Sequence, residues 1–222
     1  MNRHLLAEFV GTFVLVFAGT GAIVFDGANP GKIGHTGIAL TFGLVVMAMV
    51  YAVGSVSGAH LNPAVTLGLW FARMTPGRSV LPFILAQLAG AFAASGLLAA
   101  MFPAHPTLGA TLPFGPPWHS FVLEAWLTAV LVFVILAVSV AKPEVRPLGG
   151  AIVGGVIALE ALFAGPISGA SMNPARSLAP ALVSGSLDHL WIYLTAPFAG
   201  ALIAVPVCAG VQHPGCCREE CR

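Results

Sequence analysis

Six long apolar stretches, separated by short polar segments, dominate the chain of 222 residues. Each approaches the roughly 20 apolar residues that a helix needs to cross the hydrocarbon core of a bilayer. Because an open strand cannot satisfy its backbone groups in lipid, we predict that all six are transmembrane helices. The predicted fold class is therefore an all-α membrane protein. We place the spans near residues 5–25, 36–56, 80–101, 120–141, 147–165 and 188–210.

Two further apolar stretches are too short to cross the bilayer, and each follows an Asn-Pro-Ala triplet. Asn is a favourable helix N-cap and Pro a favourable first helical residue, so each triplet indicates a helix that begins abruptly in apolar surroundings. About ten residues at about 1.5 Å each cover half of the hydrocarbon core. We predict that Asn62-Pro63-Ala64 and Asn173-Pro174-Ala175 begin two re-entrant half-helices, which enter from opposite sides and meet tip to tip.

The two halves of the chain match beyond the triplets. Ser-Gly-Ala precedes each triplet, and a glutamate, Glu8 or Glu124, lies near the start of the first span of each half. Three spans per half give the halves opposite orientations, an inverted repeat that places its functional site near the membrane midplane. Within one transmembrane channel domain we expect repeats at 1–102 and 120–210, a linker at 103–119 and a cytoplasmic tail at 211–222.

The composition excludes a water-soluble protein. With 58% hydrophobic and 8% charged residues, the chain is too apolar for a soluble enzyme, and its net charge of +1 gives no reason to expect a nucleic-acid partner. No Walker loop or His-Glu-x-x-His motif occurs in the sequence, so we predict neither an enzyme nor a cofactor. The lipid bilayer is the expected surrounding.

The basic residues indicate the orientation, because lysine and arginine gather on the cytoplasmic side of membrane proteins. An even number of spans puts both termini on one side. Assigning them to the cytoplasm leaves Lys32 as the only basic residue of the outer loops, apart from Arg176 in the second half-helix. We predict a multi-pass protein of the plasma (inner) membrane with both termini cytoplasmic.

Two half-helix N-termini that meet at the midplane make it electropositive, because the first backbone N–H groups of a helix are unpaired. This suits a neutral polar solute or an anion and repels hydronium and metal cations. We expect Asn62 and Asn173 to cap their helices through the side-chain oxygen and to offer NH2 donors to the lumen. Since the remaining lining is apolar, water fits the predicted pore.

Glu8 and Glu124 lie at predicted membrane depth, where an unpaired charge is costly. We expect both carboxylates to accept hydrogen bonds from the unpaired backbone of the half-helix loops. A proton relay is the alternative. Their equivalent placement, one beside each loop, favours the structural role.

Residues 57–66 (SGAHLNPAVT) and 165–177 (GPISGASMNPARS) resemble the aquaporin, or major intrinsic protein, family, and the similarity covers essentially the whole chain. The resemblance implies six spans with two half-helices and a homotetramer with one pore per subunit. It also implies passive conduction of water or small neutral solutes, with exclusion of protons and ions. The family's selectivity filter, counted from the triplets, falls on Phe42, Ala161, Ala170 and Arg176.

The filter residues resemble more than one branch of the family. Water-selective members usually have histidine where this chain has Ala161, and Ala170 is also small, so the constriction is expected to be wider. The segment 165–172 is similar to plant intrinsic proteins that pass glycerol, urea or metalloid acids. The resemblance therefore implies water conduction with passage of small neutral solutes. A solute-preferring glycerol or metalloid (arsenite) channel is the alternative.

Glu160 adjoins the second filter position, and two orientations stay open. Turned into the pore, its carboxylate would face Arg176 and weaken cation exclusion, and it is the candidate group for a proton-coupled transporter. Turned away, it would face a neighbouring helix or the outer vestibule. A third class, a non-conducting scaffold, would leave the paired triplets without a use.

Three cysteines lie in the terminal tail, which the topology places in the cytosol, so disulfides are not expected. Capture of a soft metal or arsenite by these thiolates is a minor alternative to a disordered tail. Otherwise no metal site is predicted. The three are Cys216, Cys217 and Cys221.

Overall fold

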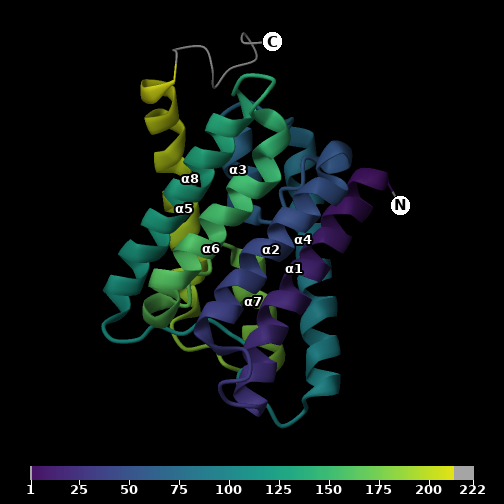
Figure 1. The fold of residues 1–222 in the computed structure, drawn as a ribbon, viewed down its shortest axis with the longest axis vertical. Helices are drawn as coiled ribbons and strands as arrows, with labels where there is room; N and C mark the ends of the chain where they lie inside the picture. The colour runs from purple at the N-terminus through teal and green to yellow at the C-terminus, as the bar shows by residue number, and fades with distance from the viewer. Residues whose placement is uncertain (1, 213–222) are drawn as a thin grey trace.

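The computed structural model describes residues 2–212, and in this part of the chain the regular secondary structure consists of helices, without strands (Figure 1). One short 3-10 helix, η1 (Arg146–Leu148), precedes α6. The long helices are α1 (Arg3–Ala28), α2 (Gly34–Ser57), α4 (Gly77–Met101), α5 (Pro117–Ser139), α6 (Gly149–Ser168) and α8 (Leu190–Val211). The two short helices are α3 (Pro63–Phe71) and α7 (Pro174–Ser184).

The six long helices confirm the predicted spans and the all-α fold class, since each is long and apolar enough to cross a membrane. Only 17% of the apolar stretch of α2 is buried inside the subunit, and 50% of that of α1. At least half of each stretch is therefore not buried inside the subunit, which leaves apolar surface for contact with lipid. Helix α5 begins at Pro117, with proline at its favourable first position, so the last three residues of the expected linker are helical.

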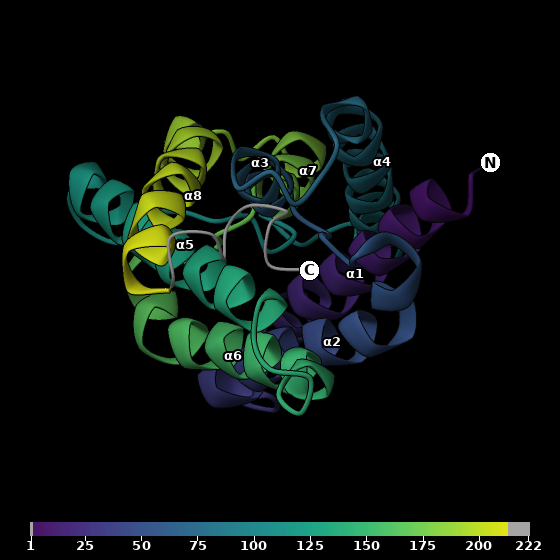
Figure 2. The same cartoon turned by 90° about the horizontal axis from the view of Figure 1, so that it is seen from above.

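Each half of the chain packs its first and last long helices in the same way, and α2 and α6 join the two halves. Helix α1 packs on α4 as α5 packs on α8, and α2 packs on α6. Each short helix contacts the last long helix of the other half, α3 against α8 and α7 against α4. Figure 2 shows α3 and α7 together between α8 and α4. The two half-helices are thus held between the last long helices of the two halves.

Glycines allow equivalent helix pairs to touch through their backbones. A Cβ at Gly90 in α4 would overlap the carbonyl oxygen of Phe9 in α1. A Cβ at Gly200 in α8 would overlap the carbonyl oxygen of Ala125 in α5. Small residues at such contacts are the usual basis of close helix packing in membranes.

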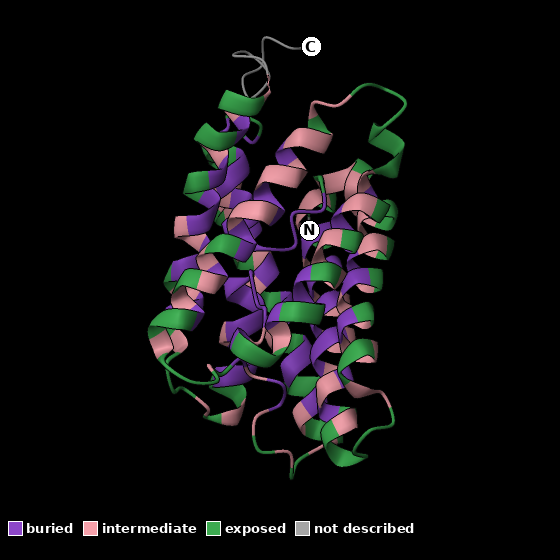
Figure 3. Ribbon diagram, turned by 60° about the vertical axis from the view of Figure 1, so that its left-hand side comes forward, coloured by how far each residue is buried: buried purple, intermediate pink, exposed green. Residues whose placement is uncertain are grey.

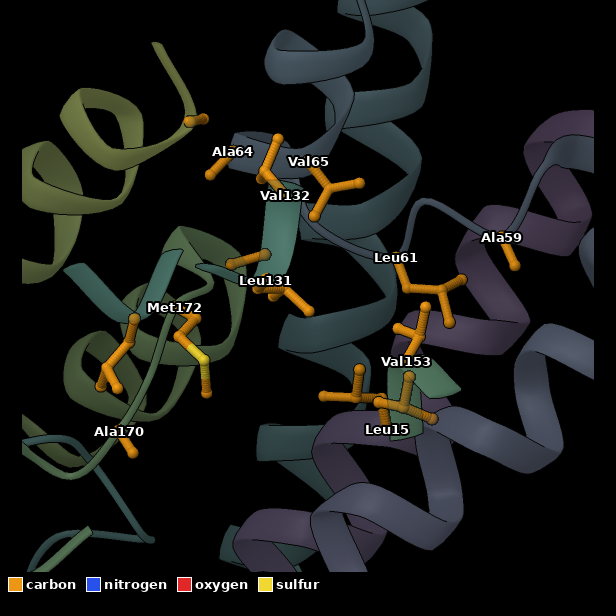
Figure 4. Close-up of a cluster of buried hydrophobic side chains, with 14 of the residues drawn as sticks. Leu15, Ala59, Leu61, Ala64, Val65, Leu131, Val132, Val153, Ala170 and Met172 are labelled. Atoms are coloured by element: carbon orange, nitrogen blue, oxygen red, sulfur yellow. The ribbon is translucent and has the colours of Figure 1, made fainter. Parts of the chain in front are cut away.

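Buried side chains concentrate on the inner faces of the helices and around the two loops that precede α3 and α7 (Figure 3). The core cluster in Figure 4 combines Leu61 of the first loop and Met172 of the second with Leu15 of α1 and Val153 of α6. The loops therefore lie inside the core rather than at the surface. This position requires every buried backbone group in them to find a partner.

Candidate functional site

The two asparagines of the triplets cap the short helices. The Asn62 Oδ1 atom accepts a hydrogen bond from the backbone N–H of Ala64 at 2.8 Å. The Asn173 Oδ1 atom accepts from the N–H groups of Ala175 at 3.0 Å and Arg176 at 3.3 Å. In both helices the proline is the first helical residue, so the local sequence sets where each helix begins.

Each asparagine also binds the opposite loop. The Asn62 Nδ2 atom donates to the carbonyl oxygen of Met172 at 2.8 Å, and the Asn173 Nδ2 atom donates to that of Leu61 at 2.9 Å. Because an amide NH2 group has two hydrogens, one hydrogen of each asparagine is left for a group in the space between the helices. The sequence predicted the capping oxygen but not these two cross-links.

The carboxylate of Glu8, fully buried in α1, supports the first loop. It accepts hydrogen bonds from the backbone N–H groups of His60 at 3.0 Å and Leu61 at 2.8 Å. It also accepts from the Ser57 hydroxyl at 2.6 Å and the Gln87 amide at 2.8 Å. These bonds satisfy donors that the loop would otherwise bury unpaired.

The carboxylate of Glu124, in α5, supports the second loop in the same way. It accepts from the backbone N–H groups of Ser171 at 2.9 Å and Met172 at 2.8 Å, and from the Ser168 hydroxyl at 2.8 Å. The carbonyl oxygen of Ser168 in turn accepts from the Tyr193 hydroxyl at 2.7 Å. In each half, one carboxylate of a long helix therefore holds the loop in place by hydrogen bonds.

A narrow cavity of about 50 Å³ runs past the meeting point of the two half-helices. At roughly 10–15 Å³ for each water, a space of this size holds only a few water molecules. Its polar lining comes from Asn62, Asn173, Arg176, His60 and Ser171. Most other lining side chains are aliphatic, among them Leu15, Val46, Val50, Val65, Leu131, Ile135, Val153 and Ile157.

Arg176 and Phe42 contact each other and both line this cavity. The guanidinium carbon lies 5.0 Å from the centre of the Phe42 ring, within the range of a cation–π interaction. The Arg176 Nη1 atom donates to the carbonyl oxygen of Gly109 at 2.8 Å, and within residues 2–212 the buried Nε atom has no hydrogen-bond partner. Ala170 lines the same cavity. Ala161 is buried at 7% exposure but is not among the lining residues.

Glu160 lies outside the cavity lining. Its side chain is 2% exposed, and neither carboxyl oxygen has a hydrogen-bond partner within the described residues. The orientation into the pore toward Arg176 is therefore not the one found, and its burial also keeps it from an open vestibule. Its carboxyl group is enclosed among the helices.

Sequence reasoning missed the polar residues that support the loops from a distance. Gln87 donates to the Thr66 hydroxyl at 2.9 Å as well as to Glu8, and Thr66 is 3.1 Å from the His60 Nδ1 atom. A lone glutamine in an apolar span was a usable signal. Gly109 belongs to the expected linker, and its carbonyl group has no sequence pattern that marks it.

The tail cysteines Cys216, Cys217 and Cys221 lie outside the described residues. Cys208 is fully buried in the hydrophobic core of the bundle. The proposed thiol site therefore stays a prediction.

Comparisons with known proteins agree on one family. The family model described as major intrinsic protein matches residues 1–207. The chain is 52% identical over 200 residues to aquaporin NIP1-4 of Oryza sativa subsp. japonica, covering 90% of this chain and 73% of the relative. Aquaporin NIP2-1 of the same organism is 44% identical, with 90% and 67% covered. The X-ray structure of the aquaglyceroporin from Plasmodium falciparum superposes with a TM-score of 0.84 at 25% identity, covering 96% of this chain and 98% of that one.

Proposed function

This chain belongs to the major intrinsic protein family, and from that premise we propose that the cavity between α3 and α7 is the pore of a channel for water and small neutral solutes. One observation carries the proposal. Asn62 and Asn173, each tied to the opposite loop, line one narrow cavity whose other walls are mainly aliphatic. A polar solute can replace hydrogen bonds to bulk water by hydrogen bonds to the two asparagines. The aliphatic walls offer few further hydrogen bonds that it would have to break to move on.

The same geometry supports exclusion of protons and cations. Two helix N-termini with partial positive charge point at the cavity, and Arg176 adds a full charge. A water molecule that accepts from the remaining amide hydrogens of Asn62 and Asn173 turns its oxygen toward them. This orientation interrupts the chain of hydrogen bonds along which a proton would hop.

Passive transport fits the cavity better than proton coupling. Among the described residues that line the cavity there is no carboxylate, and Glu160 is enclosed elsewhere. The proton-coupled transporter considered above needs the Glu160 carboxylate on the path of its substrate. The proposal therefore involves neither a chemical reaction nor a driving ion.

A channel that prefers glycerol or metalloid acids over water is the second candidate function. The observation that favours it is the small side chain of Ala170 beside the Phe42–Arg176 pair, which leaves one wall of the filter open. The similarity to an aquaglyceroporin structure agrees with a wider filter. We assign Ala161 to the same filter, in which a bulkier residue would narrow the path.

The protein crosses the membrane several times, and we propose a plasma-membrane location with both termini cytoplasmic. The linker between α4 and α5 then lies on the outer side. We also propose a homotetramer, as in the family. The large apolar surface that α2 leaves exposed in one subunit is compatible with contact between copies.

Flux measurements on reconstituted protein test the function. In proteoliposomes, we expect fast osmotic water flux and downhill swelling in isotonic glycerol, urea or arsenous acid gradients, unchanged by a proton gradient. Accumulation driven by a proton gradient and abolished in Glu160→Gln would contradict the passive channel. Absence of every flux from folded protein would favour a scaffold, and solute flux without water flux would favour the second candidate.

A further inference from the structure

The Phe42 ring is held between Arg176 on one side and helix α1 on the other. On the α1 side it packs against Gly19, which is buried but does not line the cavity. A Cβ built at Gly19 would lie 2.6 Å from both the Cδ1 and the Cζ atoms of the ring, and would overlap Cε1. Contacts below about 3 Å are not tolerated, so the missing side chain forms the recess that accepts the ring.

Contact with α4 limits how far helix α1 can move away from the ring. On another face of α1, a Cβ at Gly90 of α4 would overlap the Phe9 carbonyl and lie 3.0 Å from the Phe13 nitrogen. The backbones of α1 and α4 are therefore already in contact. Because this contact limits the movement of α1, we expect an atom added at Gly19 to displace mainly the ring.

The ring has an open direction, which leads into the pore. Phe42 is only partly buried and lines the cavity, whereas Gly19 closes the opposite side. Arg176 is anchored to the Gly109 carbonyl, so it resists moving away from an approaching ring. A ring displaced from α1 therefore moves into the cavity that it lines and leaves less room for a solute.

Gly19 belongs to a face of α1 that follows the pore. Gly11, Leu15 and Gly19 are spaced by four residues and so share one side of the helix. Leu15 lines the cavity, and a Cβ at Gly11 would meet the Leu61 side chain, with Cδ1 at 3.3 Å. Two glycines on this face thus receive side chains that border the pore.

We propose that Gly19 is a positioning residue that determines solute specificity: by receiving the Phe42 ring, it sets the width of the filter and hence the largest neutral solute that passes. The inference rests on the proposed function of the cavity as a pore. It extends the filter to a residue that contacts no solute and acts through Phe42.

The test compares two alanine variants of the same helix. Gly19→Ala is expected to lower glycerol permeability by about tenfold and osmotic water permeability by no more than about twofold, since overpacking here narrows the path for the wider solute. Gly21→Ala is the matched control, because the nearest atom to its added Cβ is Leu98 Cδ2 at an ordinary 3.4 Å. Both variants change helix propensity equally, so their difference reports the contact with Phe42.

A double variant tests whether Gly19 acts through the ring. In a Phe42→Val background, the change Gly19→Ala is expected to leave the glycerol-to-water ratio unchanged. Equal effects of Gly19→Ala with and without the ring, or proportional loss of both fluxes, would overturn the proposal. If Gly19→Ala alone fails to fold, folding of the double variant supports the coupling, and failure of both overturns it. Absence of flux from wild-type protein would instead contradict the proposed function.

Discussion

The loop before α3 and the loop before α7 follow the same backbone course. Three residues before each asparagine the backbone is left-handed, with φ of 49° at Ala59 and 40° at Ala170. The residue directly before each asparagine is also in a left-handed conformation, with φ of 53° at Leu61 and 54° at Met172. Such conformations are costly for residues other than glycine and need support from their surroundings. In both loops that support comes from a buried glutamate and from the amide of the opposite asparagine.

The side chains on this common backbone differ. Counted from the asparagines, His60 of the first loop corresponds to Ser171 of the second, and Val65 corresponds to Arg176. Only the second half-helix, α7, therefore brings an arginine to the cavity, and this arginine is tied to the linker. The comparison indicates that the duplicated features build the frame of the pore, and that the features without a counterpart give it its selectivity.

Removing a supporting carboxylate breaks the frame and is expected to have the largest effect. Glu8→Ala and Glu124→Ala each leave several buried donors unpaired at a cost of about 1–3 kcal/mol per group, so we expect little folded protein from either. Glu144→Ala, in an exposed loop, is the matched control. Thermal unfolding of the purified protein in detergent measures the difference. Wild-type stability of either variant would argue against a structural role for that glutamate.

Replacing Arg176 by valine, the residue that α3 has at the equivalent position 65, removes the main difference between the two half-helices. Arg176→Val is expected to keep the half-helix caps, because Asn173 accepts from the backbone of residues 175 and 176. Without the fixed charge, we expect proton or cation leak to rise by about tenfold, which corresponds to a barrier lowered by about 1.4 kcal/mol. A pH-sensitive dye inside proteoliposomes reports the leak, with the exposed Arg3→Val as control. An unchanged leak would show that the two helix N-termini exclude cations without Arg176.

A bulky residue at position 161 tests whether α6 contributes to the selectivity filter. Ala161 is buried and does not line the cavity, and the proposed filter assignment predicts that Ala161→His extends an imidazole toward Phe42 and Arg176. We expect glycerol permeability to fall by several-fold, or about 1 kcal/mol of added barrier, with smaller loss of water flux. Unchanged solute permeability in the folded variant would show that position 161 is outside the filter.

Features encoded by neighbouring residues could be predicted from the sequence. The spans followed from the length of apolar stretches, and the helix starts at Asn62 and Asn173 followed from Asn-Pro alone. The cross-links to Met172 and Leu61 could not be predicted, because their acceptors are backbone carbonyl groups far away in the chain. The side of α6 that carries Glu160 was equally open, since one residue along a helix turns a side chain by about 100°.

The recess at Gly19 and the Gly109 carbonyl were hidden for the same reason. A glycine in an apolar helix predicts close packing in general, but not which ring it receives. The linker residue that holds Arg176 contributes only its backbone. The contacts of Arg176 and Phe42 thus depend on partners that have no sequence pattern, whereas the two helix starts and their supporting glutamates could be predicted from the sequence.

The smallest expected effect concerns the linker, which holds Arg176 of α7 through the Gly109 carbonyl group. The His105 Nδ1 atom accepts from the backbone N–H groups of Thr107 at 3.4 Å and Leu108 at 3.0 Å, just before Gly109. These bonds require a neutral ring, and burial lowers the pKa of His105 below its usual 6.5. The two hydrogen bonds to His105 are therefore fully formed above pH 6.5. They are lost as the pH falls through the lowered pKa that His105 has in the folded protein.

We expect acidification on the linker side to loosen the contact between Gly109 and Arg176 and to change solute flux by about twofold, because a single loop hydrogen bond contributes little net energy. His105→Asn keeps a side-chain acceptor but removes the titration, so its pH profile is expected to be flatter. Stopped-flow solute flux between pH 7.5 and about 5 measures both proteins. A profile that persists in His105→Asn would assign the titration to another group, and the linker would then support Arg176 independently of pH.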